Sequence, residues 1–106
     1  MVLSIIVRFT FSGIHHWPGA PQDVEEQYLV VPHRHLFHVE AVKAVTHEER
    51  DIEFIALQRQ MISYCAIFAD PHAMSCETMA VKLLEHFGLS RCRVLEDGEN
   101  GAEVTV

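Results

Sequence analysis

Residues 33–45 read HRHLFHVEAVKAV, and this run decides the fold that the sequence predicts. Its alternation indicates one long β-strand, because successive side chains of a strand point to opposite faces. One face carries His33, His35, Phe37, Val39, Ala41, Lys43 and Val45, and the other carries Arg34, Leu36, His38, Glu40, Val42 and Ala44. Both faces mix apolar with polar residues, which is typical of a strand with contacts on each side. A charged turn over residues 46–51 is expected to end it.

A first strand is expected over Val2–Phe11, which is rich in β-branched and aromatic residues. This apolar segment is short, lacks a basic leader and has no small-residue cleavage site, so we interpret it as a strand rather than a signal peptide or membrane span. Glycines and prolines predict a loop over Ser12–Gln27. Its acidic run, Asp23–Glu26, is expected to be a solvated loop face. A short extended piece over Tyr28–Val31 is expected to stop at Pro32.

After Glu53 the hydrophobic period changes to that of helices, and two helices are predicted. The first has an apolar stripe of Phe54, Leu57, Met61, Ile62, Cys65 and Phe68. Asp70-Pro71 is expected to break it. Ser75 can cap the second helix, and Gly88 stands where a C-terminal glycine is common. The second apolar stripe is Met79, Ala80, Leu83, Leu84 and Phe87. We interpret both stripes as core.

Two more strands, Arg91–Leu95 and Ala102–Val106, are expected around a turn at Asp97–Gly101. The order is therefore strand, strand, helix, helix, strand, strand. This order predicts an α+β fold in which two helices cover one face of an antiparallel four-stranded sheet. The length of 106 residues suits one domain, residues 1–106.

The composition excludes some classes of function and favours another. A net charge of −7 and the lack of any cluster of Lys and Arg argue against nucleic-acid binding. Three cysteines without a CxxC spacing indicate neither a disulfide framework nor a zinc ribbon, and a reducing cytoplasm suits them best. Histidine is abundant, with eight residues in the chain. Because histidine is the commonest metal ligand, this excess favours a metal-site hypothesis.

The pair His33-x-His35 puts two imidazoles on one face of one strand, about 6.5–7 Å apart. A third ligand can come from His15 or His16 if the first two strands pair antiparallel. Three neutral imidazoles with an open fourth position are typical of catalytic zinc. His38 points to the opposite face, so it is not expected to share this metal.

Glu96 is the second candidate for chemistry, because it ends a predicted strand beside a polar turn. A carboxylate there can accept two hydrogen bonds from a flat heterocycle that carries neighbouring N–H groups. The alternative is a solvated acidic turn, since Asp97 and Glu99 lie next to it.

Five segments resemble the 6-pyruvoyltetrahydropterin and 6-carboxytetrahydropterin synthases, in the order found in that family. Phe9–His15 resembles the F-x-A-A-H pattern of the first strand, and His33–Phe37 resembles H-G-H-N/S-Y/F. Arg50–Leu57 resembles V-I-D-F-x-x-L, and Ser75–Ala80 resembles T-S/A-E-N-L-A. The last match is the family's ending W/K-E-T…A-E-Y, which Leu95–Asp97 and Ala102–Val104 resemble together. Together these segments span nearly the whole chain.

The resemblance implies a T-fold whose subunits join edge to edge into a barrel, as a trimer or a hexamer. It implies that His15, His33 and His35 hold Zn²⁺ and that Glu96 anchors a pterin ring. The activity implied is that of a zinc-dependent lyase on a dihydroneopterin triphosphate-type substrate, in queuosine or tetrahydrobiopterin biosynthesis. Zinc would act there as a Lewis acid.

The chain departs from the family at two positions that carry chemistry. Leu29 stands where the family has its cysteine base, and the Asp-His pair between the helices is missing. His72 and Cys76 are the candidates for the catalytic group, although the spacing of Asp70-Pro71-His72 differs from that of the family pair. Other replacement groups considered are His16, His38 and His47.

Several outcomes stay open at this point. The first is an enzyme of this family that uses replacement groups. The second is a zinc enzyme with another reaction on a pterin or deazapurine precursor. The third is a degenerate protein that binds a pterin or guanine-like ligand. A purely structural oligomer is a further class.

Overall fold

The computed structural model describes residues 1–21 and 26–106, so the expected acidic loop face over Asp23–Glu26 lies, apart from Glu26, outside the described residues. The elements follow in the order β1 (Leu3–His15), η1 (Gln27–Val30), β2 (His33–Val45), α1 (Phe54–Tyr64), η2 (Cys65–Phe68), α2 (Cys76–Phe87), β3 (Arg91–Glu96) and β4 (Asn100–Thr105). The predicted α+β class is confirmed, with a four-stranded antiparallel sheet and two α-helices in the described part of the chain.

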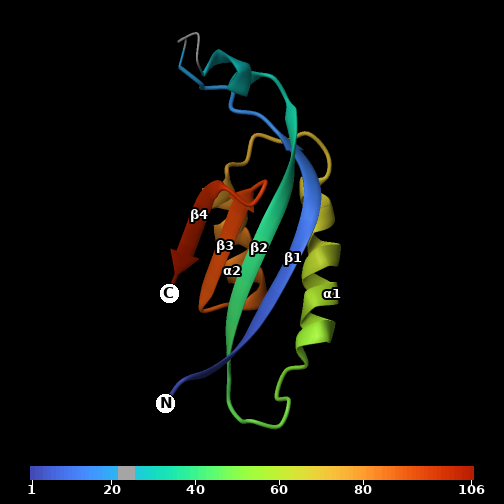
Figure 1. The fold of residues 1–106 in the computed structure, drawn as a ribbon, viewed down its shortest axis with the longest axis vertical. Helices are drawn as coiled ribbons and strands as arrows, with labels where there is room; N and C mark the ends of the chain where they lie inside the picture. The colour runs from blue at the N-terminus through green and yellow to red at the C-terminus, as the bar shows by residue number, and fades with distance from the viewer. Residues whose placement is uncertain (22–25) are drawn as a thin grey trace.

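The sheet has the strand order β1-β2-β3-β4, and a long hairpin dominates it (Figure 1). β1 and β2 pair along their whole length, from Leu3 opposite Val45 to His15 opposite His33. β3 pairs only with the part of β2 between Phe37 and Val42. The β1–β2 hairpin therefore extends past β3 and β4 at both ends.

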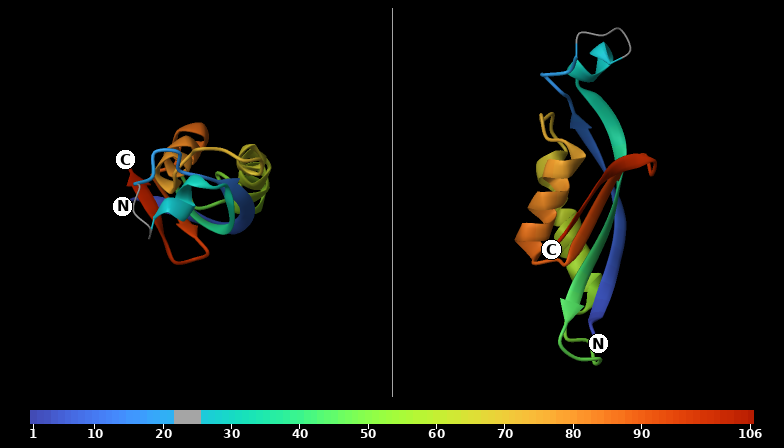
Figure 2. Two further views of the ribbon diagram at one scale, coloured as in Figure 1. Left: turned by 90° about the horizontal axis from the view of Figure 1, so that it is seen from above. Right: turned by 90° about the vertical axis from the view of Figure 1, so that its left-hand side faces the viewer.

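Both helices cover one face of the sheet, and the hydrophobic core lies between the two layers (Figure 2). The odd-numbered residues of β2 face this core, whereas the sequence analysis expected contacts on both faces of the strand. The largest fully buried side chains are Phe37, Phe68, Met61, Met79, Leu83, Val94 and Cys92. Each large apolar side chain buried in this way contributes about 1.5–3 kcal/mol. The predicted helical stripes are core except at two positions of the first stripe, Phe54 and Ile62, which are exposed.

The helix ends follow the local signals in the sequence. The Ser75 hydroxyl accepts a hydrogen bond from Thr78 N at 3.1 Å and caps α2. Gly88 ends α2 in the left-handed conformation, with φ of 61°. The Glu53 carboxylate caps α1 by accepting from two backbone N–H groups of its first turn. No helix in residues 1–21 and 26–106 has the length and hydropathy needed to cross a lipid bilayer.

Some predicted boundaries were wrong. β1 continues to His15 instead of ending at Phe11, so Gly13, which was expected in the loop, belongs to the strand. A Cβ at Gly13 would lie 2.7 Å from Phe68 O, so glycine allows the η2 backbone to approach β1. The segment expected to be extended before Pro32 is the 3-10 turn η1. The first helix tightens to 3-10 geometry at Cys65, and β4 begins before Ala102.

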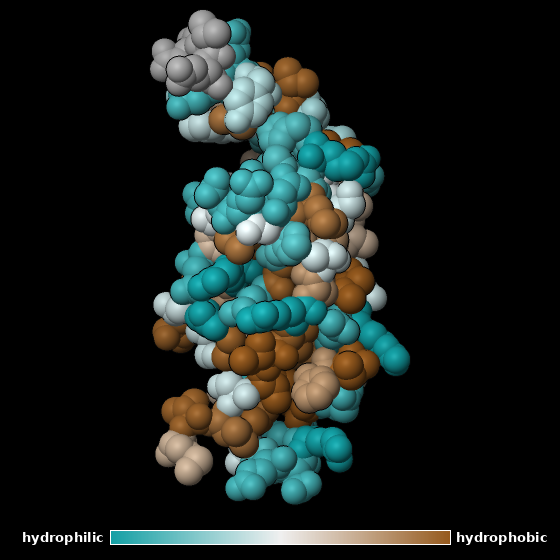
Figure 3. Space-filling view, viewed as in Figure 1, coloured by the Kyte–Doolittle hydropathy of each residue, from teal (hydrophilic) through white to brown (hydrophobic). Residues whose placement is uncertain are grey.

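The helix-free face of the sheet carries a row of alternating charges. Arg8, Glu40, Arg93 and Glu103 are register partners across all four strands. Arg8 lies 2.7 Å from Glu40, and Arg93 lies 2.9 Å from Glu103. Figure 3 shows this face, with hydrophilic side chains across its middle and an apolar area beneath them. Exposed pairs of this kind contribute at most about 1 kcal/mol each.

Candidate metal site

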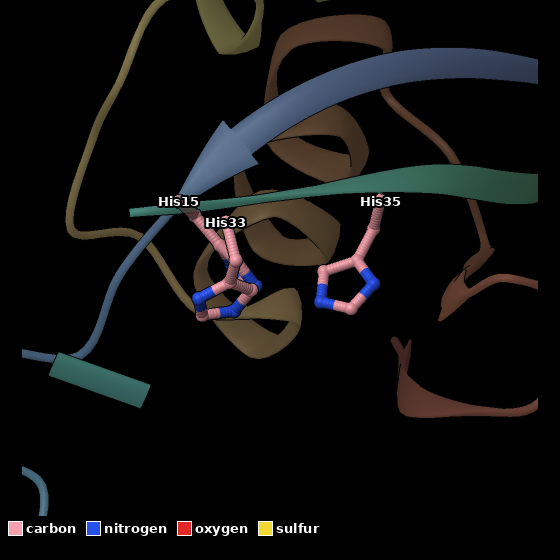
Figure 4. Close-up of side chains that lie close together, drawn as sticks. All are labelled: His15, His33 and His35. Carbon is pink, nitrogen blue, oxygen red and sulfur yellow. The ribbon is translucent and has the colours of Figure 1, made fainter. Parts of the chain in front are cut away.

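Three histidines converge where the β1–β2 hairpin leaves the rest of the sheet. His15 is the last residue of β1 and pairs with His33, the first residue of β2. His35 lies two residues further, so all three side chains are on the helix-covered face. Their potential ligand atoms lie within 4.8 Å of one another. Figure 4 shows the three rings on the same side of the two strands.

Each of these imidazoles is held through its Nδ1 atom. The contacts are His15 Nδ1 to Met74 O at 3.0 Å, His33 Nδ1 to Val31 O at 2.8 Å, and His35 Nδ1 to Asp97 Oδ2 at 2.7 Å. Carbonyl and carboxylate oxygens only accept hydrogen bonds, so each Nδ1 must carry the proton. The neutral ring then presents an unprotonated Nε2, which is how metal-bound histidines are commonly oriented.

Glu96 lies beside the three-histidine cluster, with its carboxylate against two of the rings. Its Oε1 is 3.1 Å from His15 Nε2, and its Oε2 is 3.5 Å from His35 Nε2. An unprotonated nitrogen facing a carboxylate at this distance is repulsive unless a proton or a metal cation lies between them. Burial lowers the pKa of the His15 imidazole, which disfavours the proton. The described residues therefore form a cluster that can hold a metal ion.

A cavity of about 500 Å³ opens beside the cluster. Its lining is His15, His16, Trp17, Leu29, His33, Ala73, Met74, Ser75, Cys76, Glu77, Glu96, Asn100 and Gly101. This volume is in the usual range for small-molecule sites. The lining combines apolar side chains with two carboxylates, Glu77 and Glu96, and the described part of the lining has no Lys or Arg. A ligand that donates hydrogen bonds suits this surface.

Cys76 lies at the cavity as a protonated thiol. Burial, together with the neighbouring Glu96 carboxylate, raises the pKa of Cys76 to about 12. Its Sγ lies 3.9 Å from Glu96 Oε1. Cys76 is the first residue of α2, but burial outweighs any lowering of its pKa by the helix N-terminus. Cys76 is therefore no thiolate base near neutral pH.

His72 lies beside the three-histidine cluster but does not belong to it. Its backbone bridges β1, because His72 N donates to Ile14 O and His72 O accepts from His16 N. Its ring centroid is 6.0 Å from that of His15. Met74 N donates to His72 Nδ1 at 3.0 Å, so the proton of the neutral ring is on Nε2. That Nε2 is buried and has no hydrogen-bond partner among the described residues.

The remaining histidines are placed apart from the cluster. His15, not His16, joins the three-histidine group, which decides between the two alternatives left by the sequence. His16 lines the cavity, and its buried Nδ1 has no partner in the described part of the chain. His38 lies on the helix-free face against Gly98. His47 is exposed.

Asp97 is a site residue that the sequence analysis did not identify. It has φ of 54°, an uncommon left-handed conformation for a residue other than glycine. Its backbone N donates to Leu36 O, and its Oδ1 accepts from Leu36 N. The hydrogen bond from His35 to Oδ2 is the main cause that lowers the pKa of Asp97. An aspartate in a tight turn was a visible signal, but its contact with His35 depends on the β2–β3 register.

A scan of protein-family models and a search of curated proteins found no match to this chain.

Proposed function

We propose that this protein is a zinc-dependent lyase of the tetrahydropterin synthase type that acts on a dihydroneopterin triphosphate-type substrate. The observation that supports the proposal is the convergence of three Nδ1-anchored imidazoles beside a 500 Å³ cavity that also contains Glu96. The resemblance of five sequence segments to that family supplies the reaction class.

The donor set favours zinc over harder cations. Three neutral imidazoles suit zinc and other late transition metals, whereas magnesium and calcium prefer oxygen ligands. His15, His33 and His35 would hold the ion, and bound zinc supplies Lewis-acid polarisation of substrate oxygens. The protein's part is to fix the three rings through Met74 O, Val31 O and Asp97.

The cavity wall is suited to a flat ring. Trp17 and Met74 offer apolar surface, and Glu96 can accept N–H groups of a pterin or guanine-like base. The Cys76 thiol can donate a long hydrogen bond to the Glu96 carboxylate, with Sγ 3.9 Å from Oε1. Triphosphate would meet no Lys or Arg in the described lining, so its charge has to be balanced by the metal or by a second subunit.

Metal content and turnover test this proposal together. Purified protein is expected to contain about one zinc per chain, and His33→Ala or His35→Ala should abolish it. His38→Ala is the matched control, because His38 belongs to the same strand but to the opposite face. The zinc protein should convert dihydroneopterin triphosphate with loss of triphosphate, measured by mass spectrometry. Equal zinc in His33→Ala and the wild type would contradict the proposed ligands.

A second function is a degenerate T-fold protein that binds a pterin or guanine-like ligand without changing it. Two observations favour it: Leu29 replaces the family's cysteine, and the thiol of Cys76 has a pKa near 12. The same incubation decides, because a bound pterin recovered unchanged supports this second function. If neither metal nor pterin binds, only a structural role is left.

The proposal includes a homo-oligomer, as a trimer or hexamer, in the cytoplasm. β1 and β4 are the two edges of the sheet, and edges of this kind are surfaces for strand pairing between subunits. Cys65, Cys76 and Cys92 are all free and buried, which suits a reducing compartment.

A further inference from the structure

Glu96 has a position that a ring anchor alone does not require. It is the last residue of β3 and pairs with Phe37 of β2, so its side chain shares a face with the three imidazoles. Both carboxylate oxygens contact ring nitrogens of the cluster: Oε1 lies 3.1 Å from His15 Nε2, and Oε2 lies 3.5 Å from His35 Nε2. The carboxylate thus faces the same nitrogens that a metal would use.

Each of these two distances is close to that between two ligands of one ion, although they involve different carboxylate oxygens and, within the described residues, Glu96 has no such contact with His33. Atoms bound to a tetrahedral zinc ion at about 2.0–2.2 Å lie about 3.3 Å from one another. The two contacts of Glu96, at 3.1 and 3.5 Å, fall on either side of this value. Glu77, the other carboxylate of the cavity wall, has no such contact with a ring of the cluster within the described residues.

We propose that Glu96 is the fourth ligand of the metal in the substrate-free protein, which rests on the proposed three-histidine metal site. His15, His33, His35 and Glu96 then form a closed site. A carboxylate ligand lowers the net charge of a divalent site from two to one, and the fourth position opens only when the carboxylate leaves it. The Glu96 side chain is 33% exposed and its remaining contact is the Cys76 thiol at 3.9 Å, so it is free to turn toward a ligand in the cavity.

The two carboxylates at the end of β3 thus serve one ring from both sides. Asp97 accepts a hydrogen bond from His35 Nδ1, while Glu96 Oε2 lies 3.5 Å from His35 Nε2. Because Glu96 and Asp97 are adjacent, the β3–β4 turn fixes both at once. In this arrangement the β3–β4 turn positions residues for metal binding as well as for binding a ring in the cavity.

Metal affinity tests the fourth ligand without any activity assay. Zinc dissociation constants are measured by competition with a chromophoric chelator for the wild type, Glu96→Gln and Glu77→Gln. Glu96→Gln should weaken zinc binding at least about 10-fold, since even outer residues of metal sites contribute about 10–100-fold. Glu77→Gln should stay within about twofold of the wild type, because Glu77 lines the cavity without touching the cluster. Equal affinities of Glu96→Gln and the wild type would overturn the proposal.

A spectroscopic measurement on the Co²⁺-substituted protein separates ligation from a loss of folding. The visible absorption of the wild type should differ from that of Glu96→Gln, while Glu77→Gln should match the wild type. If Glu96→Gln does not fold by circular dichroism, Glu96→Asp, which withdraws the carboxylate by one methylene, takes its place. Should His33→Ala lose zinc while Glu96→Gln keeps it, only the fourth ligand fails. Retention of zinc by His33→Ala would reject the three-histidine site itself.

Discussion

At the scale of single residues, the site is defined by which nitrogen of each imidazole is free. Backbone oxygens of Met74 and Val31 and the carboxylate of Asp97 each accept a hydrogen bond from one Nδ1. These contacts leave three Nε2 atoms for an ion and prevent the rings from turning away. Of the three acceptors only Asp97 can be changed by mutation without moving the backbone.

Substituting Asp97→Asn tests this orienting role. The amide can keep the hydrogen bond from Leu36 N, but it loses the charge that faces His35. Zinc affinity is therefore expected to fall about 10–100-fold while the protein stays folded. Chelator competition gives the affinity, and thermal unfolding of the metal-free protein reports the fold.

Glu99→Gln is the matched control for Asp97, because Glu99 is an exposed carboxylate of the same turn and, within the described residues, makes no hydrogen bond or ion pair with the three rings. It should bind zinc as the wild type does. A zinc affinity of Asp97→Asn within twofold of the wild type would mean that His35 needs no carboxylate to hold its orientation.

At the scale of elements, β1 brings His15 to the site only because the strand continues through Gly13. The carbonyl of Phe68 approaches Gly13 so closely that a Cβ would lie 2.7 Å from it and 3.0 Å from the Phe37 ring. The η2 segment therefore packs on β1 immediately before His15, the first of the three candidate ligands. Gly13 links the helical layer to the end of the strand.

Replacement of Gly13 by alanine is expected to destabilise the protein by about 1–3 kcal/mol, because the new methyl group overpacks this contact. The free energy of unfolding is measured by chemical denaturation. Gly19→Ala is the matched control, since a Cβ there meets only Trp17, at an ordinary 3.5 Å. It should remain within about 0.5 kcal/mol of the wild type. Equal stabilities of the two variants would show that the Gly13 contact can relax.

The sequence predicted the elements well where their signals are local. The strand His33–Val45 has the expected bounds, and Ser75 and Gly88 mark the ends of α2 as capping residues do. The error at Gly13 has a physical cause, because glycine there permits a contact with Phe68, which is distant in sequence. The segment around Tyr28 was misassigned because a short 3-10 turn has no periodic signal.

For the site, the sequence indicated the three histidines but not what holds them. The pair His33-x-His35 follows from strand alternation, and the register of the hairpin places His15 opposite His33. The Nδ1 contacts of His15 and His35 join residues more than fifty positions apart, so no local pattern could reveal them. The zinc identity, the pterin ligand and the assembly stay predictions.

At the scale of the whole molecule, the chain is elongated for its length. Its extents are 53, 25 and 20 Å, and its radius of gyration is 15.2 Å. A compact domain of this size would have a radius of gyration of about 13 Å. Its accessible surface of 6772 Å² exceeds the roughly 6,000 Å² typical of a monomer of this mass. The long hairpin causes this shape, and it leaves apolar side chains such as Ile6 and Leu36 exposed.

We expect the purified protein to be an oligomer in solution, with a mass three or six times that of the 12.1 kDa chain. Association would cover exposed apolar side chains and both edges of the sheet. Light scattering coupled to size-exclusion chromatography measures this mass directly. A single peak at the mass of one chain would remove the assembly from the proposal.

The backbone hydrogen bonds of His72 connect the candidate metal site to the segment between the two helices. Through hydrogen bonds with Ile14 and His16, the segment between the two helices is attached to the backbone on either side of His15, a candidate metal ligand. An ion seated at His15 would thus anchor the interhelical connection along with the tip of the hairpin. Chelation should therefore loosen both of these segments together, although they are far apart in the sequence.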